Sequence, residues 1–286
     1  MVLPQLIEKL LKALLINYMN KTFSHLRVSS EYSITQGLLT INQLVECAKK
    51  HSVPSLALTD KSNMFAMVKF FSKCEAQGIK PISGSSLKVI FDEDDTSHEL
   101  LLLAKNNNGH KNLMKVISNA HNNFKYQNPI ISFKDLQEFK DDVIAISGGK
   151  DSHLFELIKR KKNNEVLNRI DKFLKIFKDD FFIEVQKTNR SDEHEYFSNI
   201  LPLACSKGVP LIATNDVLFS EPDDYEVHET KVCINTGRTL NDPNREKIFS
   251  NEQYFKSPKE MQDLFISRKL HFDAGKRTLL DKKVQL

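Results

Sequence analysis

The sequence of 286 residues predicts an α/β fold, and two observations carry this prediction. Short apolar or β-branched runs recur along the chain, and amphipathic segments with helical spacing lie between them. Strands that alternate with helices favour a largely parallel sheet, either open or closed into a barrel. The length suits one large domain or two small ones, and α/β barrels often fill it as a single unit.

Seven strands are predicted, each a short run bounded by turn residues or by a helical pattern. In chain order they are Phe23–Val28, Ser55–Thr59, Lys80–Ile90, Glu99–Ala104, Val143–Ser147, Phe181–Gln186 and Pro210–Thr214. Six amphipathic helices are predicted at Ile41–His51, Met64–Gln77, Asn112–Asn123, Ser152–Lys161, Glu165–Phe177 and Glu193–Lys207. The acidic turn at 92–97 joins the third and fourth strands as a hairpin.

Capping residues support the helix assignments. Thr40 or Asn42 can cap the first helix and Asn63 the second, because their side chains accept hydrogen bonds from free N–H groups. Gly78 and Gly208 follow two of the helices, at the place where a left-handed glycine commonly ends one.

Composition excludes several classes of protein. The net charge of +4, from 41 basic and 37 acidic residues, is too small to predict nucleic-acid binding by itself. The four cysteines form no CxxC pair, so neither a zinc knuckle nor a redox dithiol is indicated, and reduced thiols in a cytoplasmic protein are expected. No apolar run reaches the roughly 18 residues that span a bilayer, so no membrane partner is expected.

The stretch HLRVSSEYSITQG, from His25 to Gly37, organises the chain. It predicts a strand that ends in a polar turn and leads into a helix, and α/β barrels build their sites at the carboxyl ends of strands. The stretch resembles the opening motif of the PHP (polymerase and histidinol phosphatase) domain of bacterial DNA polymerase III alpha subunits. Four further blocks follow in the family's order, from about residue 23 to 265: LALTDKSNMFAMVKFF, GIKPISG, LLLLAKNNNGHKNL and IATNDVLF. The resemblance implies a distorted seven-stranded (β/α) barrel of the PHP type.

The resemblance also implies a site. An active PHP domain holds three metal ions with nine ligands, mostly histidine and carboxylate, which suit zinc, manganese or iron and hydrolyse phosphoesters. In this sequence the nine positions fall on Arg27, Ser29, Gln36, Lys61, Ser86, Glu99, Gly149, Asp216 and Leu218. Asp216 alone keeps the family's residue, and Glu99 is the other side chain that could bind a metal.

Cations at two of these positions argue against a metal centre. Arginine has no lone pair to donate, and a cation close to a divalent ion is repelled, most strongly in a half-buried site. We therefore expect a vestigial site with no active catalytic residue and no cofactor. Arg27 and Lys61 are expected to pair with Asp60, Glu99 or Asp216. The alternative is one weakly bound divalent ion at Asp216 and Glu99.

By the same resemblance, four regions are expected. Residues 1–18, amphipathic and upstream of Met19, look like an extension before the family's usual start, with a membrane-lying helix as the alternative. Residues 19–237 form the PHP domain, 238–265 begin the connection toward a polymerase palm, and 266–286 are a divergent tail.

The function expected from the resemblance is structural. The chain resembles a PHP fragment of a polymerase engaged in DNA replication. The remainder of the polymerase is its expected partner, and a proofreading exonuclease subunit is a second candidate. DNA is expected to be contacted only indirectly. No region resembles the palm that carries DNA-directed nucleotidyltransferase chemistry, so the chain is not expected to polymerise DNA. Two alternatives are an active metal-dependent phosphoesterase or 3′–5′ exonuclease, and a free-standing scaffold.

Overall fold

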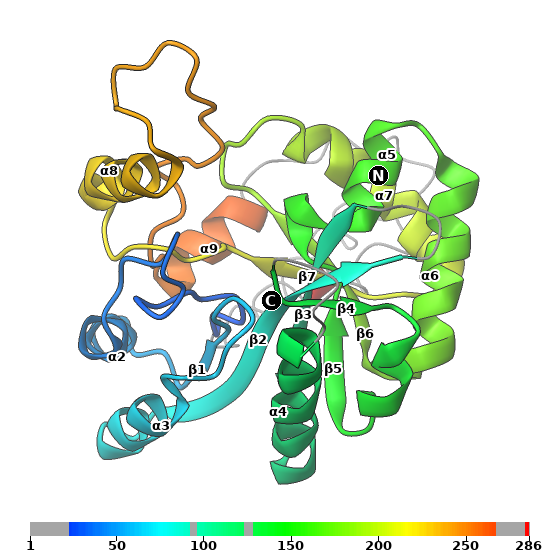
Figure 1. Cartoon of the computed structure of the whole chain (residues 1–286), viewed down its shortest axis with the longest axis horizontal. Coiled ribbons are helices and arrows are strands. Elements are labelled where there is room, and N and C mark those ends of the chain that lie inside the picture. Colours follow the sequence, from blue (N-terminus) through cyan, green and yellow to red (C-terminus); the bar gives the residue numbers. More distant parts are fainter. Residues whose placement is uncertain (1–22, 92–95, 123–127, 267–283, 286) are drawn as a thin grey trace, which may run out of the picture.

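A computed structural model describes residues 23–91, 96–122, 128–266 and 284–285 of the chain. The expected extension at 1–18, part of the acidic turn at 92–97 and most of the tail at 266–286 lie outside the described residues. A curled sheet occupies the centre, and helices lie along its outer side (Figure 1). This arrangement confirms the α/β barrel type of fold.

Within the described residues, eight strands form the sheet. They are β1 (Ser55–Leu58), β2 (Lys80–Ile90), β3 (Ser97–Ala104), β4 (Ile130–Ser132), β5 (Val143–Ile146), β6 (Phe181–Gln186), β7 (Leu211–Thr214) and β8 (Val284–Gln285). Hydrogen-bonded neighbours follow the order β1-β2-β3-β5-β6-β7-β8. The short strand β4 stands outside this order and pairs with β2. Six of the predicted strands are therefore confirmed, whereas β4 and β8 were not predicted.

Among the described strands the sheet is largely parallel, as expected, and the antiparallel placement of β3 is the one departure from that expectation. β3 runs antiparallel to both β2 and β5, while β1–β2, β5–β6 and β6–β7 are parallel. A hairpin between β2 and β3 requires the reversal. The amino end of β3, with Glu99, therefore lies beside the carboxyl ends of the parallel strands.

The stretch 23–28 is extended but is not a strand, so its prediction was wrong in that respect. Thr59 N donates to Val28 O at 2.9 Å, and Val217 N donates to Arg27 O at 3.1 Å. The stretch thus lies between the end of β1 and the residues that follow β7. It connects the two sides of the curled sheet through a few hydrogen bonds instead of a regular ladder.

Eight α-helices lie within the described residues; the first six follow the predicted pattern, and the last two along the chain were not predicted. They are α2 (Ile41–Lys50), α3 (Met67–Ala76), α4 (Asn107–Asn122), α5 (His153–Lys159), α6 (Asn163–Phe177), α7 (Glu193–Lys207), α8 (Tyr225–Thr236) and α9 (Pro258–Ile266). Short 3-10 helices are η1 (Asp135–Phe139), η2 (Gly149–Asp151), η3 (Lys178–Asp180) and η4 (Pro222–Asp224).

Side-chain caps set several helix ends. Thr40 caps α2 in a reciprocal arrangement with Gln43, as the sequence predicted. Asn63 does not cap α3, because the helix begins only at Met67; its Oδ1 instead accepts from Phe65 N at 3.2 Å in the turn before the helix. Helix α4 begins five residues earlier than predicted, because the side-chain Oδ1 of Asn106 accepts from the N–H groups of Asn108 and Gly109 in its first turn.

Alternation along the strands separates two apolar regions. Leu100 and Leu102 of β3 belong to a large core under the outer helices, whereas Leu101 and Leu103 belong to a smaller cluster on the opposite face. That smaller cluster draws residues from β1, β3, β5 and β7, so it fills the concave interior of the curled sheet. No helix of the described residues is long and apolar enough to cross a membrane.

Candidate functional site

The concave face of the sheet changes from apolar to polar toward the carboxyl ends of its parallel strands. Side chains two residues apart point to the same face of a strand, so Glu184 shares a face with Phe182 of the interior cluster. Glu99 shares a face with Leu101 in the same way. The apolar interior therefore gives way to buried carboxylates at one end of the barrel, and this is the end where α/β barrels place their sites.

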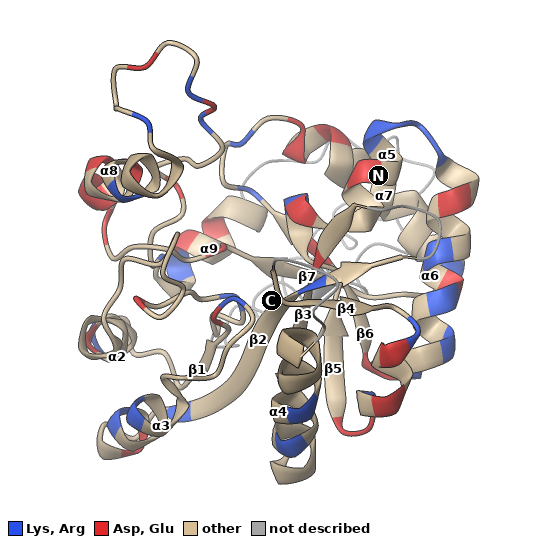
Figure 2. Ribbon diagram, viewed as in Figure 1, with Lys and Arg blue, Asp and Glu red and all other residues tan. Residues whose placement is uncertain are grey.

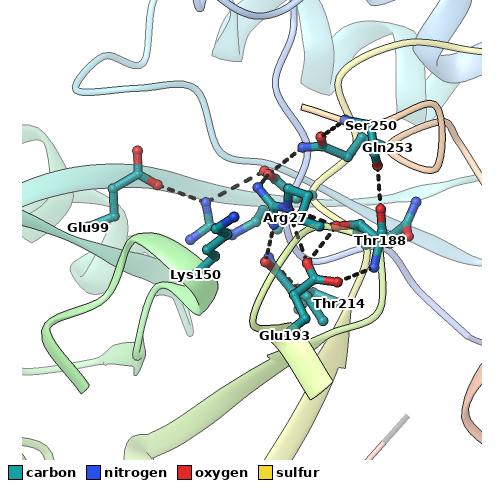
Figure 3. A network of polar contacts seen from close by, with 12 residues as sticks. Arg27, Glu99, Lys150, Thr188, Glu193, Thr214, Ser250 and Gln253 are labelled. Atoms are coloured by element: carbon teal, nitrogen blue, oxygen red, sulfur yellow. Dashed lines mark hydrogen bonds and ion pairs between the residues drawn. The ribbon is translucent and has the colours of Figure 1, made fainter. Parts of the chain in front are cut away.

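Arg27 lies at the centre of this polar end, in contact with three carboxylates (Figure 3). Its Nε and Nη2 donate to the two carboxylate oxygens of Glu184 at 2.9 and 3.2 Å. Its Nη1 donates to Glu99 at 3.0 Å and lies 3.7 Å from Asp216 Oδ1. The side chain is 4% exposed, so solvent screens these ion pairs little.

Lys61 supplies a second cation. Its Nζ donates to Glu99 Oε1 at 2.5 Å, and Ser86 Oγ donates to Glu99 Oε2 at 3.1 Å. Burial acts to raise the pKa of the Glu99 carboxyl, but the charges of Lys61 and Arg27 outweigh it and hold that pKa well below its ordinary value. Burial acts to lower the pKa of Lys61, and the charges of Glu99 and Asp216 raise it above its ordinary value. Both members of the Lys61–Glu99 pair therefore stay charged.

Glu184 is a site residue that the sequence analysis missed. It is fully buried, and besides Arg27 its carboxylate accepts from the hydroxyl of Thr214 and from Gln186 Nε2 at 3.2 Å. The available signal was a carboxylate inside the apolar strand FFIEVQ, because glutamate is almost never fully buried without a partner.

Asp216 is held by two residues that the sequence analysis also missed. Its Oδ2 accepts from Gln253 Nε2 at 2.8 Å and from Arg190 Nη1 at 3.3 Å. Arg190 in turn donates through Nε to Glu193 at 3.1 Å and to Thr188 Oγ1 at 2.8 Å. Asp216 has φ of 52°, a left-handed conformation that aspartate tolerates better than most residues. No local sequence pattern indicated Gln253, which lies 37 residues further along the chain.

The expected ion pairs of Arg27 and Lys61 are present with Glu99, and Arg27 also reaches Asp216. Asp60, the third expected partner, has different contacts. Its carboxylate accepts from Ser30 N, Ser30 Oγ and Ser33 Oγ, each at 2.7 Å. Burial raises the pKa of Asp60, and these hydrogen bonds oppose the rise. Asp60 therefore fixes the polar turn instead of neutralising a cation.

At the other positions that the resemblance assigned to metal ligands, the residues take part in backbone hydrogen bonds or close packing. Ser29 N donates to Val217 O at 2.9 Å, and Leu218 N donates to Gln253 O at 2.9 Å. Gln36, half-buried, lies in the turn and its N–H donates to Ser33 O at 2.9 Å. Gly149 has φ of +58°, and a Cβ there would lie 2.6 to 2.8 Å from the Gln186 carboxamide. A metal-binding side chain at Gly149 would displace that carboxamide.

The side chains at these positions do not fit a metal ion. Arg27 and Lys61 have no lone pair to donate in their charged forms, and each already neutralises the carboxylate of Glu99. Among the described residues, no group of three or more histidine, cysteine, aspartate or glutamate side chains is arranged to hold a metal ion. The geometry supports an ionic cluster that joins β3, β6 and the segments after β7.

Comparisons with known proteins identify the class. Residues 25–188 match the PHP domain family, which is more than half of the chain, and the chain belongs to that family. It is 36% identical to the DNA polymerase III subunit alpha of Pseudomonas aeruginosa over 249 residues, 86% of this chain and 21% of that protein. It is 37% identical to the alpha subunit of Escherichia coli K12 over 246 residues, 85% of this chain and 21% of that protein. The chain thus spans about a fifth of the length of these relatives, and the resemblance predicted from its motifs is confirmed.

Among solved structures, the chain is similar to a Bifidobacterium adolescentis protein named as a metal-dependent phosphoesterase. The TM-score is 0.48 and the sequence identity 14%, over 68% of this chain and 86% of that one.

Proposed function

We propose that this chain is the PHP portion of a replicative DNA polymerase alpha subunit in the cytoplasm, and that its former metal site now holds the barrel together. Membership of the PHP family and the similarity to alpha subunits over 85% of the chain support the role in DNA replication. Arg27 carries the structural part of the proposal, because its guanidinium lies among three carboxylates. Ion pairs replace metal bonds as the contacts between strand ends.

Electrostatics favours this assignment over hydrolysis. A divalent ion bound by Glu99, Glu184 and Asp216 would share the space with a guanidinium that stays charged at any ordinary pH. Two like charges a few ångströms apart repel by several kcal/mol at an effective dielectric constant of about 20. The three carboxylates of the cluster are satisfied by side chains, so the metal-dependent phosphoesterase or 3′–5′ exonuclease alternative lacks a free ligand set.

We propose docking as the second part of the role. The remainder of the polymerase is the first partner and a proofreading exonuclease subunit the second, while DNA is contacted only indirectly. Figure 2 supports the last point, because most helices carry both basic and acidic residues in that view, although α4 carries basic residues alone. The net charge of +4 adds no strong basic field to attract nucleic acid.

Metal analysis and a nuclease assay test the structural proposal together. The purified chain is dialysed against zinc or manganese, its metal content is measured, and it is incubated with single-stranded DNA labelled at the 5′ end. We expect far less than one ion per chain and no shortening of the DNA. Stoichiometric metal with hydrolysis that Asp216→Ala abolishes would establish the exonuclease alternative instead.

Co-purification tests the docking proposal. The tagged chain is mixed with the remainder of a related alpha subunit and, separately, with a proofreading exonuclease subunit. Retention of the first partner is expected. Failure to retain either would favour a free-standing scaffold.

A further inference from the structure

The segment Ser250–Ser257, here called the strap, lies across the residues that follow β6 and β7. Leu218 N donates to Gln253 O at 2.9 Å, and Phe255 N donates to Phe219 O at 3.0 Å. Ser250 Oγ donates to the carbonyl oxygen of Thr188, directly after β6. Figure 3 shows Ser250 and Gln253 side by side next to Thr188. The strap therefore covers the end of the barrel at which the charge cluster lies.

Gln253 links the strap to the cluster. It is fully buried, its Nε2 donates to Asp216 Oδ2 at 2.8 Å, and its Oε1 accepts from Ser250 N at 3.0 Å. Both ends of the carboxamide are thus satisfied, one by the charged cluster and one by the strap itself. A hydrogen bond to a carboxylate is about twice as strong as one between neutral groups.

Asn215 and His25 hold the backbone of the strap on either side of Gln253. Asn215 Nδ2 donates to the carbonyl oxygens of Glu252 and Tyr254 at 3.1 and 2.7 Å. His25 Nε2 donates to the carbonyl oxygen of Lys256 at 2.7 Å. These contacts recognise backbone groups, which are the same in any extended peptide, so the barrel end forms a site for a polypeptide segment.

The strap also fixes where the next helix begins. Ser257 N donates to Glu260 Oε2 at 2.7 Å and Glu260 N donates to Ser257 Oγ at 3.2 Å, a reciprocal cap on α9. Lys187, next to the end of β6, donates to Leu264 O at 3.1 Å near the other end of α9. By contrast, the loop at 237–249 before the strap is largely exposed.

We propose that the barrel end has become a binding site for the strap, and that Asp216, through Gln253, positions α9. Asp216 then serves as the anchor for the segment that leaves the barrel, not as a metal ligand. This inference rests on the proposed structural role, and it adds that the cluster determines where the chain leaves the barrel.

Hydrogen exchange of the full chain tests the anchor. Gln253→Ala removes both carboxamide contacts, and Asn251→Ala is the matched control, because Asn251 is exposed in the same strap. We expect exchange in the strap and in α9 to become about tenfold faster in Gln253→Ala, with β2 and β3 unchanged. Exchange equal to that of Asn251→Ala would overturn the proposal.

Cleavage of the loop gives a test that needs no destabilised variant. A protease recognition sequence is inserted after Glu246, in the exposed loop, and the cleaved protein is analysed by size-exclusion chromatography. The carboxyl-terminal piece, with the strap and α9, is expected to co-elute with the barrel. Its release from the otherwise unchanged chain would refute the anchor. Metal content measured on the same sample tests the proposed function separately.

Discussion

Replacing Arg27 by alanine is the perturbation whose size follows most directly from the structure. The guanidinium makes a bidentate contact with Glu184, a hydrogen bond with Glu99 and a longer ion pair with Asp216. Glu184 is fully buried and Glu99 is 7% exposed, so solvent cannot replace the lost contacts. Removing one partner of a buried ion pair costs about 3–5 kcal/mol, because the remaining charge is left uncompensated.

Urea unfolding at pH 7, followed by circular dichroism, measures this cost. Arg160→Ala is the control, because Arg160 forms an exposed ion pair with Glu156 one turn away, where about 0.2–0.5 kcal/mol is expected. Adding Glu184→Gln to Arg27→Ala should recover part of the loss, since it removes one uncompensated charge. A loss for Arg27→Ala no larger than that of the control would refute the reasoning.

The pH dependence provides an independent check on the same variant. The pKa of Glu99 is lowered in the folded chain, so its contribution to stability is present above the unfolded pKa and is lost as the pH falls toward the folded value. Arg27→Ala weakens that contribution. The difference in unfolding free energy between the natural chain and Arg27→Ala should therefore shrink as the pH falls below about 4.5. A constant difference would contradict the assignment.

Three further predictions concern other parts of the fold. Thr40→Ala removes the cap of α2 and should lower the free energy of unfolding by about 1 kcal/mol in urea; no change would contradict the capping role. Gly149→Ala should cost about 1–3 kcal/mol, and more than Gly208→Ala, because both have a positive φ but only Gly149 would bring a Cβ against Gln186. Burial lowers the pKa of His25 from 6.5 to about 4, so stability should fall as the pH drops from 6.5 toward 4. His25→Phe should flatten this slope by up to about 1.4 kcal/mol per pH unit, and an unchanged slope in thermal unfolding would refute it.

The strands and outer helices were predictable because burial imposes periodicity on the sequence. Six predicted strands and the capped start of α2 at Thr40 are confirmed for that reason. The stretch 23–28 misled the prediction, because it hydrogen-bonds to its neighbours at only a few positions and forms no regular ladder. The early start of α4 depended on one side-chain cap from Asn106, within a run of three asparagines that left the choice open.

The candidate site was predictable only in part. The resemblance assigned Arg27, Lys61 and Glu99 to ligand positions of one site. Their opposite charges then predicted that Arg27 and Lys61 form ion pairs with Glu99. Glu184 could have been identified from the single charged residue inside an apolar strand. Gln253 could be identified only from the folded structure. Contacts between residues far apart in sequence leave no local pattern, so the strap could not have been inferred before the structure.

Anomalous diffraction from crystals of the unmodified chain grown with manganese tests the central claim most directly. We predict no anomalous peak among Glu99, Glu184 and Asp216, with density for the Arg27 guanidinium in contact with these carboxylates. A manganese ion bound to them, with Arg27 turned away, would contradict the account.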